Sequence, residues 1–167
     1  MKNTTLCYVE REGAYLMLHR VKKKNDENAG KWVGVGGHFE EGESPYDCAV
    51  REIFEETGLC AARMRYRGVV TFVSDRYETE QMHLFTVDDF VGDACFPVYD
   101  GRETDTPDCV EGNLAWVKKE DVLTLPLWEG DQLFLSLLAS GEPFFSLKLV
   151  YTGDTLTAAV KNGILLR

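Results

Sequence analysis

Alternating apolar and polar positions predict β-strands along most of the chain. Residues 4–10 and 14–20 alternate in this way on either side of the polar turn 11–13, which predicts an opening hairpin. A second hairpin, turned at "TGD", is predicted to close the chain over residues 144–163. Between the hairpins, further strands are predicted at residues 32–39 (a short strand that runs into glycines), 62–75, 78–92 and 113–119.

Two segments instead have the spacing and end signals of α-helices. Residues 44–58 begin with a capping serine, Ser44, and a proline suited to the first turn, and they end at Gly58. Residues 125–141 predict a second helix that ends at a glycine. The remaining polar or turn-rich segments, residues 21–31 and 95–112, are predicted to be loops.

This order of strands, helix, strands, helix and strands predicts an α+β protein, built as an α/β/α sandwich around a mixed sheet. A length of 167 residues suits one domain, residues 1–167, with one sizeable core. No internal repeat or interdomain linker interrupts the pattern.

Charge and composition narrow the function classes. A net charge of −10 argues against binding to nucleic-acid polymers or anionic membranes, which favour basic surfaces. A small anionic substrate remains compatible with this charge if a divalent cation neutralises it. The N-terminus lacks the apolar segment of a signal peptide, and the 5 cysteines lack CxxC spacing, so we expect reduced thiols and a cytoplasmic location.

Three carboxylates share one side of the first predicted helix. Glu52, Glu55 and Glu56 fall within a sector of about 100° on a helical wheel. The other side is apolar and is expected to pack on the protein. That apolar side comprises Tyr46, Ala49, Val50, Ile53, Phe54 and Thr57.

This acidic side has two interpretations: a solvated face, or a site for a hard divalent cation, which binds oxygen ligands. Solvated faces usually mix charge signs, whereas Glu52 and Glu56 form a like-charge i,i+4 pair that costs about 0.2–0.5 kcal/mol in an isolated helix. Arg51 can reach Glu55 at i+4 and orient it. These details favour the cation site and leave the solvated face open.

The same residues carry a resemblance to a known family. Gly37, five residues, Glu43, seven residues and then R-E-I-F-E-E-T-G-L at 51–59 match the Nudix box, G-x5-E-x7-R-E-U-x-E-E-x-G-U. The chain therefore resembles Nudix hydrolases. The resemblance implies an α/β/α sandwich and hydrolysis of a nucleoside diphosphate linked to another group, with Mg²⁺ as cofactor and Mn²⁺ as an alternative.

The resemblance also implies roles in the metal site. Glu52 and Glu56 would be the main Mg²⁺ ligands, Glu55 a further one and Gly36 a ligand through its carbonyl. Arg51 and Glu43 would hold the loop in shape. Glu111 matches in context a downstream glutamate that family members use as a base or extra ligand; the alternative is an ordinary loop carboxylate.

Outside the box, the chain loosely resembles the MutT-like nucleoside triphosphate pyrophosphohydrolases that act on oxidised purine nucleotides. By this resemblance Trp128 would stack on a base, Asp131 would bind the base edge and Phe72 would line the pocket. Core packing is the alternative for Trp128. Val33 replaces an asparagine that contacts the damaged base in such relatives, so specificity would be lost or achieved differently. Arg20 is a further candidate contact for an anionic ligand.

The predicted function is Mg²⁺-dependent hydrolysis of a nucleoside triphosphate, such as 8-oxo-dGTP, to the monophosphate and pyrophosphate. One alternative is a Nudix hydrolase of ADP-ribose, a dinucleoside polyphosphate or a similar substrate. The other alternative is a non-catalytic module that senses nucleotides. The expected partner is a small nucleotide, and the expected assembly is a monomer or homodimer.

Overall fold

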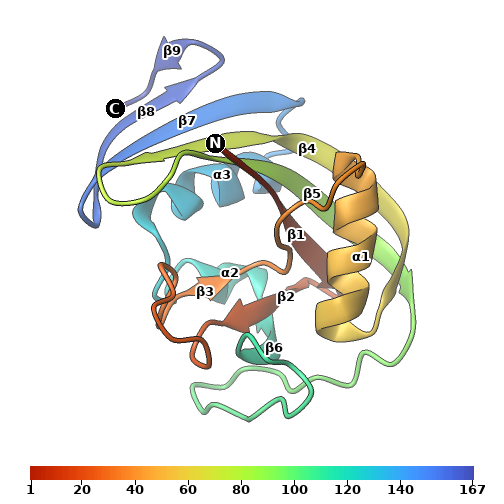
Figure 1. The fold of residues 1–167 in the computed structure, drawn as a ribbon. Helices are drawn as coiled ribbons and strands as arrows, with labels where there is room; N and C mark the ends of the chain where they lie inside the picture. Colours follow the sequence, from red (N-terminus) through yellow and green to blue (C-terminus); the bar gives the residue numbers. More distant parts are fainter.

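A nine-stranded mixed sheet with helices on both faces forms the protein (Figure 1). The computed structural model describes all residues from Met1 to Arg167. The strands are β1 Lys2–Arg11, β2 Ala14–His19, β3 Trp32–Val33, β4 Cys60–Ser74, β5 Glu80–Val91, β6 Asn113–Lys118, β7 Phe145–Thr152, β8 Thr155–Lys161 and β9 Ile164–Leu165. The helices are α1 Pro45–Thr57, α2 Lys119–Val122 and α3 Glu129–Ala139. The prediction of an α+β sandwich is confirmed.

The strands follow the order β3-β2-β1-β5-β4-β7-β8-β9, and β6 pairs separately with β2. β1 runs parallel to β5 and β4 runs parallel to β7, whereas the other neighbours are antiparallel. Past β3, the chain continues along β1 through isolated bridges at Cys7–Val35 and Thr4–His38. This pairing places residues 34–37, called here the glycine-rich segment, beside β1 and next to helix α1, which follows it in the chain.

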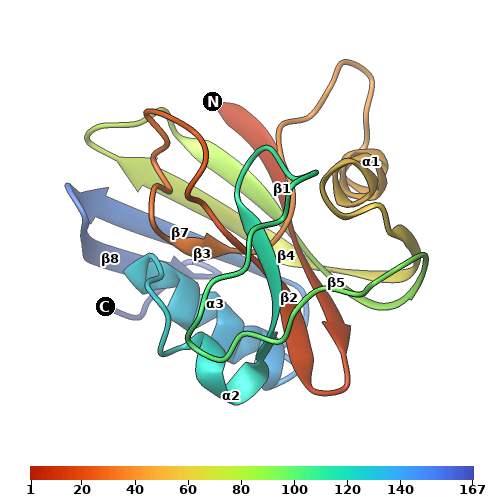
Figure 2. The same ribbon diagram turned by 90° about the horizontal axis from the view of Figure 1, so that it is seen from below.

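The core has two parts, one on each face of the sheet. Figure 2 shows α1 on one face and α2 with α3 on the other. Ala49 and Ile53 of α1 pack into one buried cluster, while Phe134 and Leu138 of α3 pack into the second. None of the helices is long and apolar enough to cross a lipid bilayer.

Helix α1 has the ends that the sequence predicts. Ser44 accepts a hydrogen bond from the Asp47 N–H (3.1 Å), and Asp47 accepts one from the Ser44 N–H (2.9 Å), which completes a capping box. Gly58 ends the helix in the left-handed region with φ of 76°, and its N–H bonds the Phe54 carbonyl.

The prediction of which α1 side chains pack on the protein is partly wrong. Val50 and Phe54 are 43% and 55% exposed, and Tyr46 is half-exposed. The helix instead packs through the small side chains of Cys48 and Ala49 together with Ile53. Its inward stripe is rotated because Cys48 faces the glycine-rich segment beside β1, where its thiol contacts the Thr5 hydroxyl and the Gly37 carbonyl. Both of these contacts measure 3.5 Å.

The predicted start of the second helix is also wrong. Helix α3 begins at Glu129, and residues 125–128 are not helical. Pro126 disfavours a helical conformation at the residue before it. Its carbonyl accepts a hydrogen bond from the Trp32 N–H at 2.9 Å, which ties this segment to β3. The short helix α2 and the two-residue strand β9 carried no sequence signal that predicted them.

We expect Ser44→Ala to destabilise the protein by about 1 kcal/mol, because one N-terminal amide of α1 loses its hydrogen-bond partner. Urea denaturation measures this change. Ser136→Ala, on an exposed position of α3, is the control and is expected to stay within about 0.5 kcal/mol of wild type. Equal effects of the two substitutions would contradict the capping assignment.

Candidate active site

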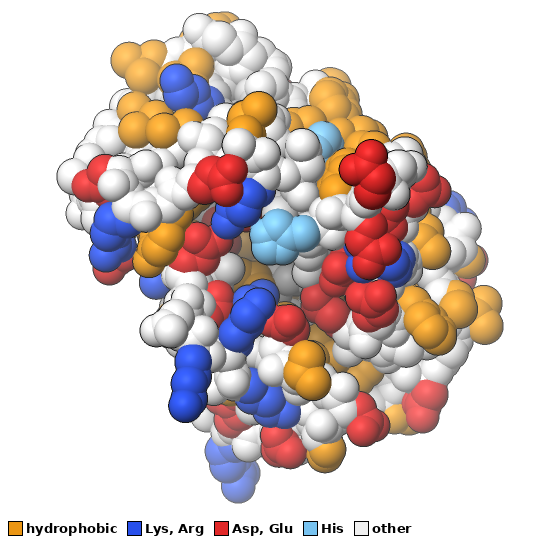
Figure 3. Space-filling model, in the orientation of Figure 1, with side chains coloured by type: hydrophobic (Ala, Val, Ile, Leu, Met, Phe, Trp, Pro, Cys, Tyr) orange, Lys and Arg blue, Asp and Glu red, His pale blue; other side chains and the backbone are white.

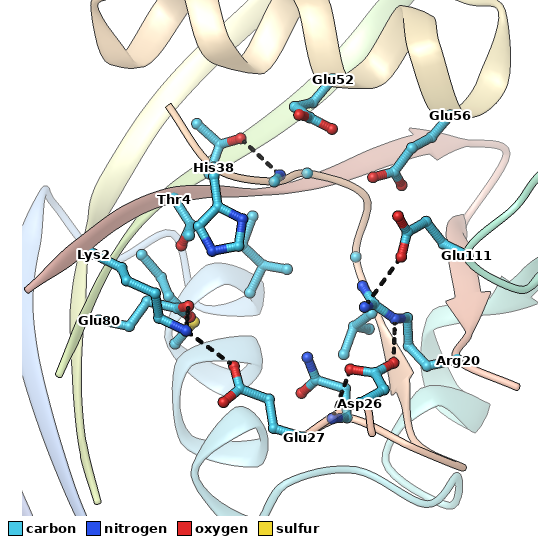
Figure 4. A pocket seen from close by; sticks show the side chains of 18 of the residues that line it. Lys2, Thr4, Arg20, Asp26, Glu27, His38, Glu52, Glu56, Glu80 and Glu111 are labelled. Atoms are coloured by element: carbon cyan, nitrogen blue, oxygen red, sulfur yellow. Dashed lines mark hydrogen bonds and ion pairs between the residues drawn. The ribbon is translucent and has the colours of Figure 1, made fainter. Parts of the chain in front are cut away.

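A cavity of about 650 Å³ lies beside α1 and the glycine-rich segment. The hollowed face has a cluster of acidic side chains on one side and a mixture of basic and acidic side chains on the other (Figure 3). In Figure 4, Glu52, Glu56 and Glu111 point toward one end of the cavity, while Lys2 and Glu27 lie at the other. The cavity therefore has an acidic end and a separate end of different chemistry.

Glycines bring the backbone close to both neighbours at the acidic end. A Cβ atom at Gly36 would lie 2.0 Å from the Thr5 carbonyl oxygen, and one at Gly37 would lie 2.6 Å from the Glu52 carboxyl carbon. The carbonyls of Val35 and Gly37 accept hydrogen bonds from β1. Because carbonyls alternate along an extended segment, the intervening Gly36 carbonyl faces away from β1.

Arg51 connects this segment to α1. Its guanidinium donates two hydrogen bonds to Glu43, both at 2.8 Å, and one to the His38 carbonyl at 3.0 Å. It also donates to Glu52 at 2.8 Å and to Glu55 at 3.2 Å, the expected i,i+4 contact. These bonds lower the pKa of Glu43 to about 2 and fix the position of the Glu52 carboxylate.

Glu56 forms no ion pair of this kind, whereas Glu111 pairs with Arg20 and, at 3.8 Å, with Lys23. The Oε2 atoms of both carboxylates are buried without a hydrogen-bond partner. Arg20 Nη2 lies 3.2 Å from Glu111 Oε2, but Arg20 directs its Nε–H to Asp26 instead, at 2.8 Å. Burial, reinforced by the charge of Glu52, raises the pKa of Glu56 well above its usual value.

These carboxylates fit a divalent cation. Buried, unpartnered oxygens are costly unless a ligand satisfies them, and Mg²⁺ takes oxygen ligands. Glu52, Glu55, Glu56, Glu111 and Gly36 all line the one cavity. No three acidic, histidine or cysteine side chains form a ready-made metal cage. Backbone, water and substrate oxygens would therefore complete the coordination shell.

Aromatic rings lie at the other end of the cavity together with Lys2 and Glu27, because Phe72 is the sheet partner of Glu80 and Glu80 is that of Lys2. Phe72 and Trp128 line this end with ring centroids 5.5 Å apart, and Tyr151 packs 5.1 Å from each ring. Trp128 is only 6% exposed, so it belongs to the core and also contributes to the cavity wall. The predicted residue Val33 lines the same cavity and adds an apolar surface.

The first turn of α3 places Asp131 in the cavity wall beside these rings. It is 6% exposed, and burial raises its pKa to about 8, although Lys31 acts in the opposite direction. At neutral pH the side chain is therefore mostly protonated. A neutral carboxyl can both donate and accept a hydrogen bond.

Sequence reasoning missed several residues of the cavity wall. Asn28 accepts a hydrogen bond from Trp128 Nε1 at 2.8 Å. Lys2 lies 3.5 Å from both Glu27 and Glu80 and so joins the polar loop to β5. These contacts join residues far apart in sequence, and the loop of residues 21–31 carries no periodicity that indicates which side chains face inward.

Gly130, beside Asp131, has a structural role. The Gly130 N–H donates to the Tyr151 hydroxyl at 2.6 Å. A Cβ at this position would lie 2.5 Å from Leu149 Cδ1 and 2.7 Å from the Tyr151 oxygen. Glycine thus permits the close approach of α3 to β7.

Comparisons with known proteins agree with this geometry. The NUDIX domain model matches residues 2–138. A Nudix hydrolase of Bacillus subtilis named YvcI is 30% identical over 157 residues, which are 92% of this chain and 89% of the relative. The oxidized purine nucleoside triphosphate hydrolase of Mus musculus is 29% identical over 124 residues, covering 73% of this chain and 71% of the relative.

A solved structure shows the same fold. The MutT protein from Bacillus halodurans superposes with a TM-score of 0.79 at 24% identity, covering 97% of this chain and 98% of that chain. The chain belongs to the Nudix family. It is a Nudix hydrolase, an enzyme that acts on phosphoric anhydride bonds, and members of this family generally use divalent metal ions.

We expect Asp131→Asn to flatten the pH dependence of stability. The pKa of Asp131 is about 8 in the folded protein and about 3.9 in an unfolded chain. The folded state therefore binds more protons between these values, and wild-type stability falls by up to about 1.4 kcal/mol per pH unit as pH rises.

Urea denaturation at several pH values from 5 to about 8 measures this slope. Asp108→Asn, at an exposed loop position, is the control and is expected to keep the wild-type slope. The same slope in wild type and Asp131→Asn would contradict the assignment of a neutral Asp131.

Proposed function

We propose that the protein is a Mg²⁺-dependent nucleoside triphosphate pyrophosphohydrolase, in which residues 1–167 act as one domain. It would convert its substrate to the nucleoside monophosphate and pyrophosphate. The observation that supports this function is a single cavity with the box carboxylates at one end and an aromatic pocket with a neutral acid at the other. A nucleotide has the matching halves, a phosphate chain and a base.

At the acidic end, Glu52, Glu56 and the Gly36 carbonyl would hold the cation, with Glu55 at the rim. When bound, Mg²⁺ neutralises phosphate charge and lowers the pKa of a water ligand. Arg51 would position these ligands through the bonds described above. The cluster is suited to phosphoryl chemistry because electrostatics and positioning dominate such reactions.

Glu111 is the proposed proton acceptor. Its Oε2 is buried, lacks a hydrogen bond and faces the same end of the cavity as Glu56 (Figure 4). Arg20, with Nη2 3.2 Å from this oxygen, would orient the carboxylate and would offer a positive group to the phosphate chain. The buried position of Glu111 in the cavity favours a role as general base over that of an ordinary loop carboxylate.

At the aromatic end, Trp128 and Phe72 would form apolar walls for the base, and Asp131 would hydrogen-bond its edge. The mouse relative is named for oxidised purine nucleoside triphosphates, which makes 8-oxo-dGTP the first candidate. Val33 gives the pocket an apolar side chain without a donor or acceptor. Discrimination between oxidised and ordinary guanine therefore depends on other residues of the cavity.

Product identification tests this proposal. Purified protein is incubated with Mg²⁺ and a panel of ordinary and oxidised nucleoside triphosphates, ADP-ribose and dinucleoside polyphosphates. The proposal expects pyrophosphate and a monophosphate from a purine triphosphate as the fastest reaction. Preference for a dinucleotide or for ADP-ribose would replace the proposed substrate class, and no hydrolysis of any compound would leave only the sensing function.

We expect Glu56→Gln to reduce turnover at least a hundredfold while the fold is kept. The substitution removes a ligand charge from the metal site and also relieves the repulsion between Glu56 and Glu52. Melting temperature without metal should therefore hold or rise. Glu41→Gln, an exposed position outside the cavity, is the control. Near wild-type activity in a folded Glu56→Gln protein would refute the metal assignment.

Chelation should stop turnover without unfolding the protein. Helix α1 is capped at both ends and is packed through Cys48, Ala49 and Ile53, so its formation does not depend on a cation. Circular dichroism and activity are measured before and after exhaustive chelation and again after Mg²⁺ is restored. Full activity after chelation, or loss of the fold, would contradict this account.

A further inference from the structure

The side-chain amide of Asn28 is held in one orientation. Trp128 Nε1 donates a hydrogen bond to Asn28 Oδ1 at 2.8 Å. An indole N–H is only a donor, so the amide oxygen must face it. Rotation of the amide by 180° would place two donors against each other. The Nδ2 group of Asn28 is consequently fixed on the other side of the amide.

The backbone of this loop is held as well. The Asn28 N–H donates to Asp26 Oδ1 at 3.0 Å, and its carbonyl accepts from the Lys31 N–H at 2.9 Å. Asp26 is in turn bonded by Arg20, and Glu27 pairs with Lys2 across the cavity. Figure 4 shows these contacts of Asp26 and Glu27 at the cavity wall. Asn28 is thus a fixed part of the wall.

The free donor has no partner in the protein. Asn28 lines the cavity, and its hydrogen bonds involve Oδ1 and the backbone but not Nδ2. The side chain of Val33, which lines the same cavity, has no polar atom. A half-buried N–H₂ group directed away from its one side-chain partner is available to a ligand that carries an acceptor.

The position of this donor relates it to the base. Asn28 bonds the Nε1 edge of the Trp128 ring. Lys31 Nζ lies over the ring, 4.5 Å from its centroid, so a base stacked on that face would displace the lysine. The edge of such a base would then lie beside Asn28. Purines differ in the exocyclic group on this edge. Some carry a carbonyl oxygen, which accepts a hydrogen bond, and others carry an amino group, which donates one. A fixed N–H₂ group can donate to the carbonyl oxygen, but it offers no acceptor to the amino group.

We propose that Asn28 is a specificity-determining residue that selects purines with a carbonyl at position 6 over those with an amino group there. This inference rests on the proposed nucleotide hydrolase function. Asn28 supplies the donor that Val33 does not. Its selectivity depends on Trp128, which prevents the amide from turning to present its oxygen. The expected preference is about tenfold or more, the range that follows when a buried hydrogen-bonding group is left unpaired.

Asn28→Asp is the most direct test. The carboxylate keeps one oxygen for the Trp128 N–H and presents an acceptor to the base in place of the donor. We expect the ratio of kcat/KM for dGTP and dITP to that for dATP to fall at least tenfold. The added negative charge acts on the same triphosphate in each substrate, so it cancels in this ratio. Asn162→Asp, outside the cavity, makes the same chemical change and should leave the ratio unaltered.

Equilibrium binding of dGMP and dAMP, measured calorimetrically without metal, gives the same comparison independently of turnover. If Asn28→Asp does not fold, Trp128→Phe replaces it. This variant keeps an aromatic ring but releases the amide, and the base ratio should move toward one. An unchanged ratio in these variants would overturn the inference.

Asp131→Asn separates this outcome from failure of the proposed function. If Asp131→Asn alters the base ratio and Asn28→Asp does not, the base pocket stands and the role of Asn28 is refuted. If the wild-type protein neither hydrolyses nor binds any purine nucleotide, the proposed function itself fails.

Discussion

The arrangement of the acidic end depends on how Arg51 distributes its hydrogen bonds. One guanidinium holds both oxygens of Glu43, the Glu52 carboxylate and the His38 carbonyl. It thereby connects α1 to the segment that precedes the helix, through Glu43 and the His38 carbonyl. Planar, bidentate geometry makes arginine suited to this task, and lysine would not reproduce it. The backbone hydrogen bonds of Val35 and Gly37 to β1 place Gly36, and Arg51 adds the position of the Glu52 carboxylate relative to it.

Because Arg51 is committed to these partners, it does not compensate the charge of Glu56, whereas Glu111 pairs with Arg20 and Lys23. The buried Oε2 atoms of Glu56 and Glu111 lack hydrogen bonds, which is unfavourable in the isolated protein, and a bound divalent cation would remove this cost. The aromatic end carries a related cost in Asp131, which burial keeps protonated near neutral pH. Both ends of the cavity thus contain groups that a nucleotide with its metal would satisfy. The cost to stability lies where function is proposed, as is common for enzyme sites.

Local signals predicted the parts of the structure that depend on local chemistry. Helix α1 was predicted with its caps because Ser44 and Gly58 act on the backbone next to them. The exposure of Phe54 was mispredicted because the direction of packing depends on the distant segment that Cys48 contacts. Asn28 escaped prediction for the same reason, since its partner lies 100 positions away in the chain. The spacing of residues in the sequence predicts the acidic cluster. The residues of the other cavity wall come together only through tertiary contacts, so the sequence alone does not identify them.

The central claim is that one cavity holds the cation at its acidic end and the base at its aromatic end. Anomalous diffraction from a crystal grown with Mn²⁺ and a non-hydrolysable purine triphosphate tests it most directly. The account predicts a manganese peak next to Glu52, Glu56 and the Gly36 carbonyl, with the base against Trp128 and its edge at Asn28 and Asp131. A manganese peak away from these carboxylates, or a base bound outside the aromatic pocket, would contradict it.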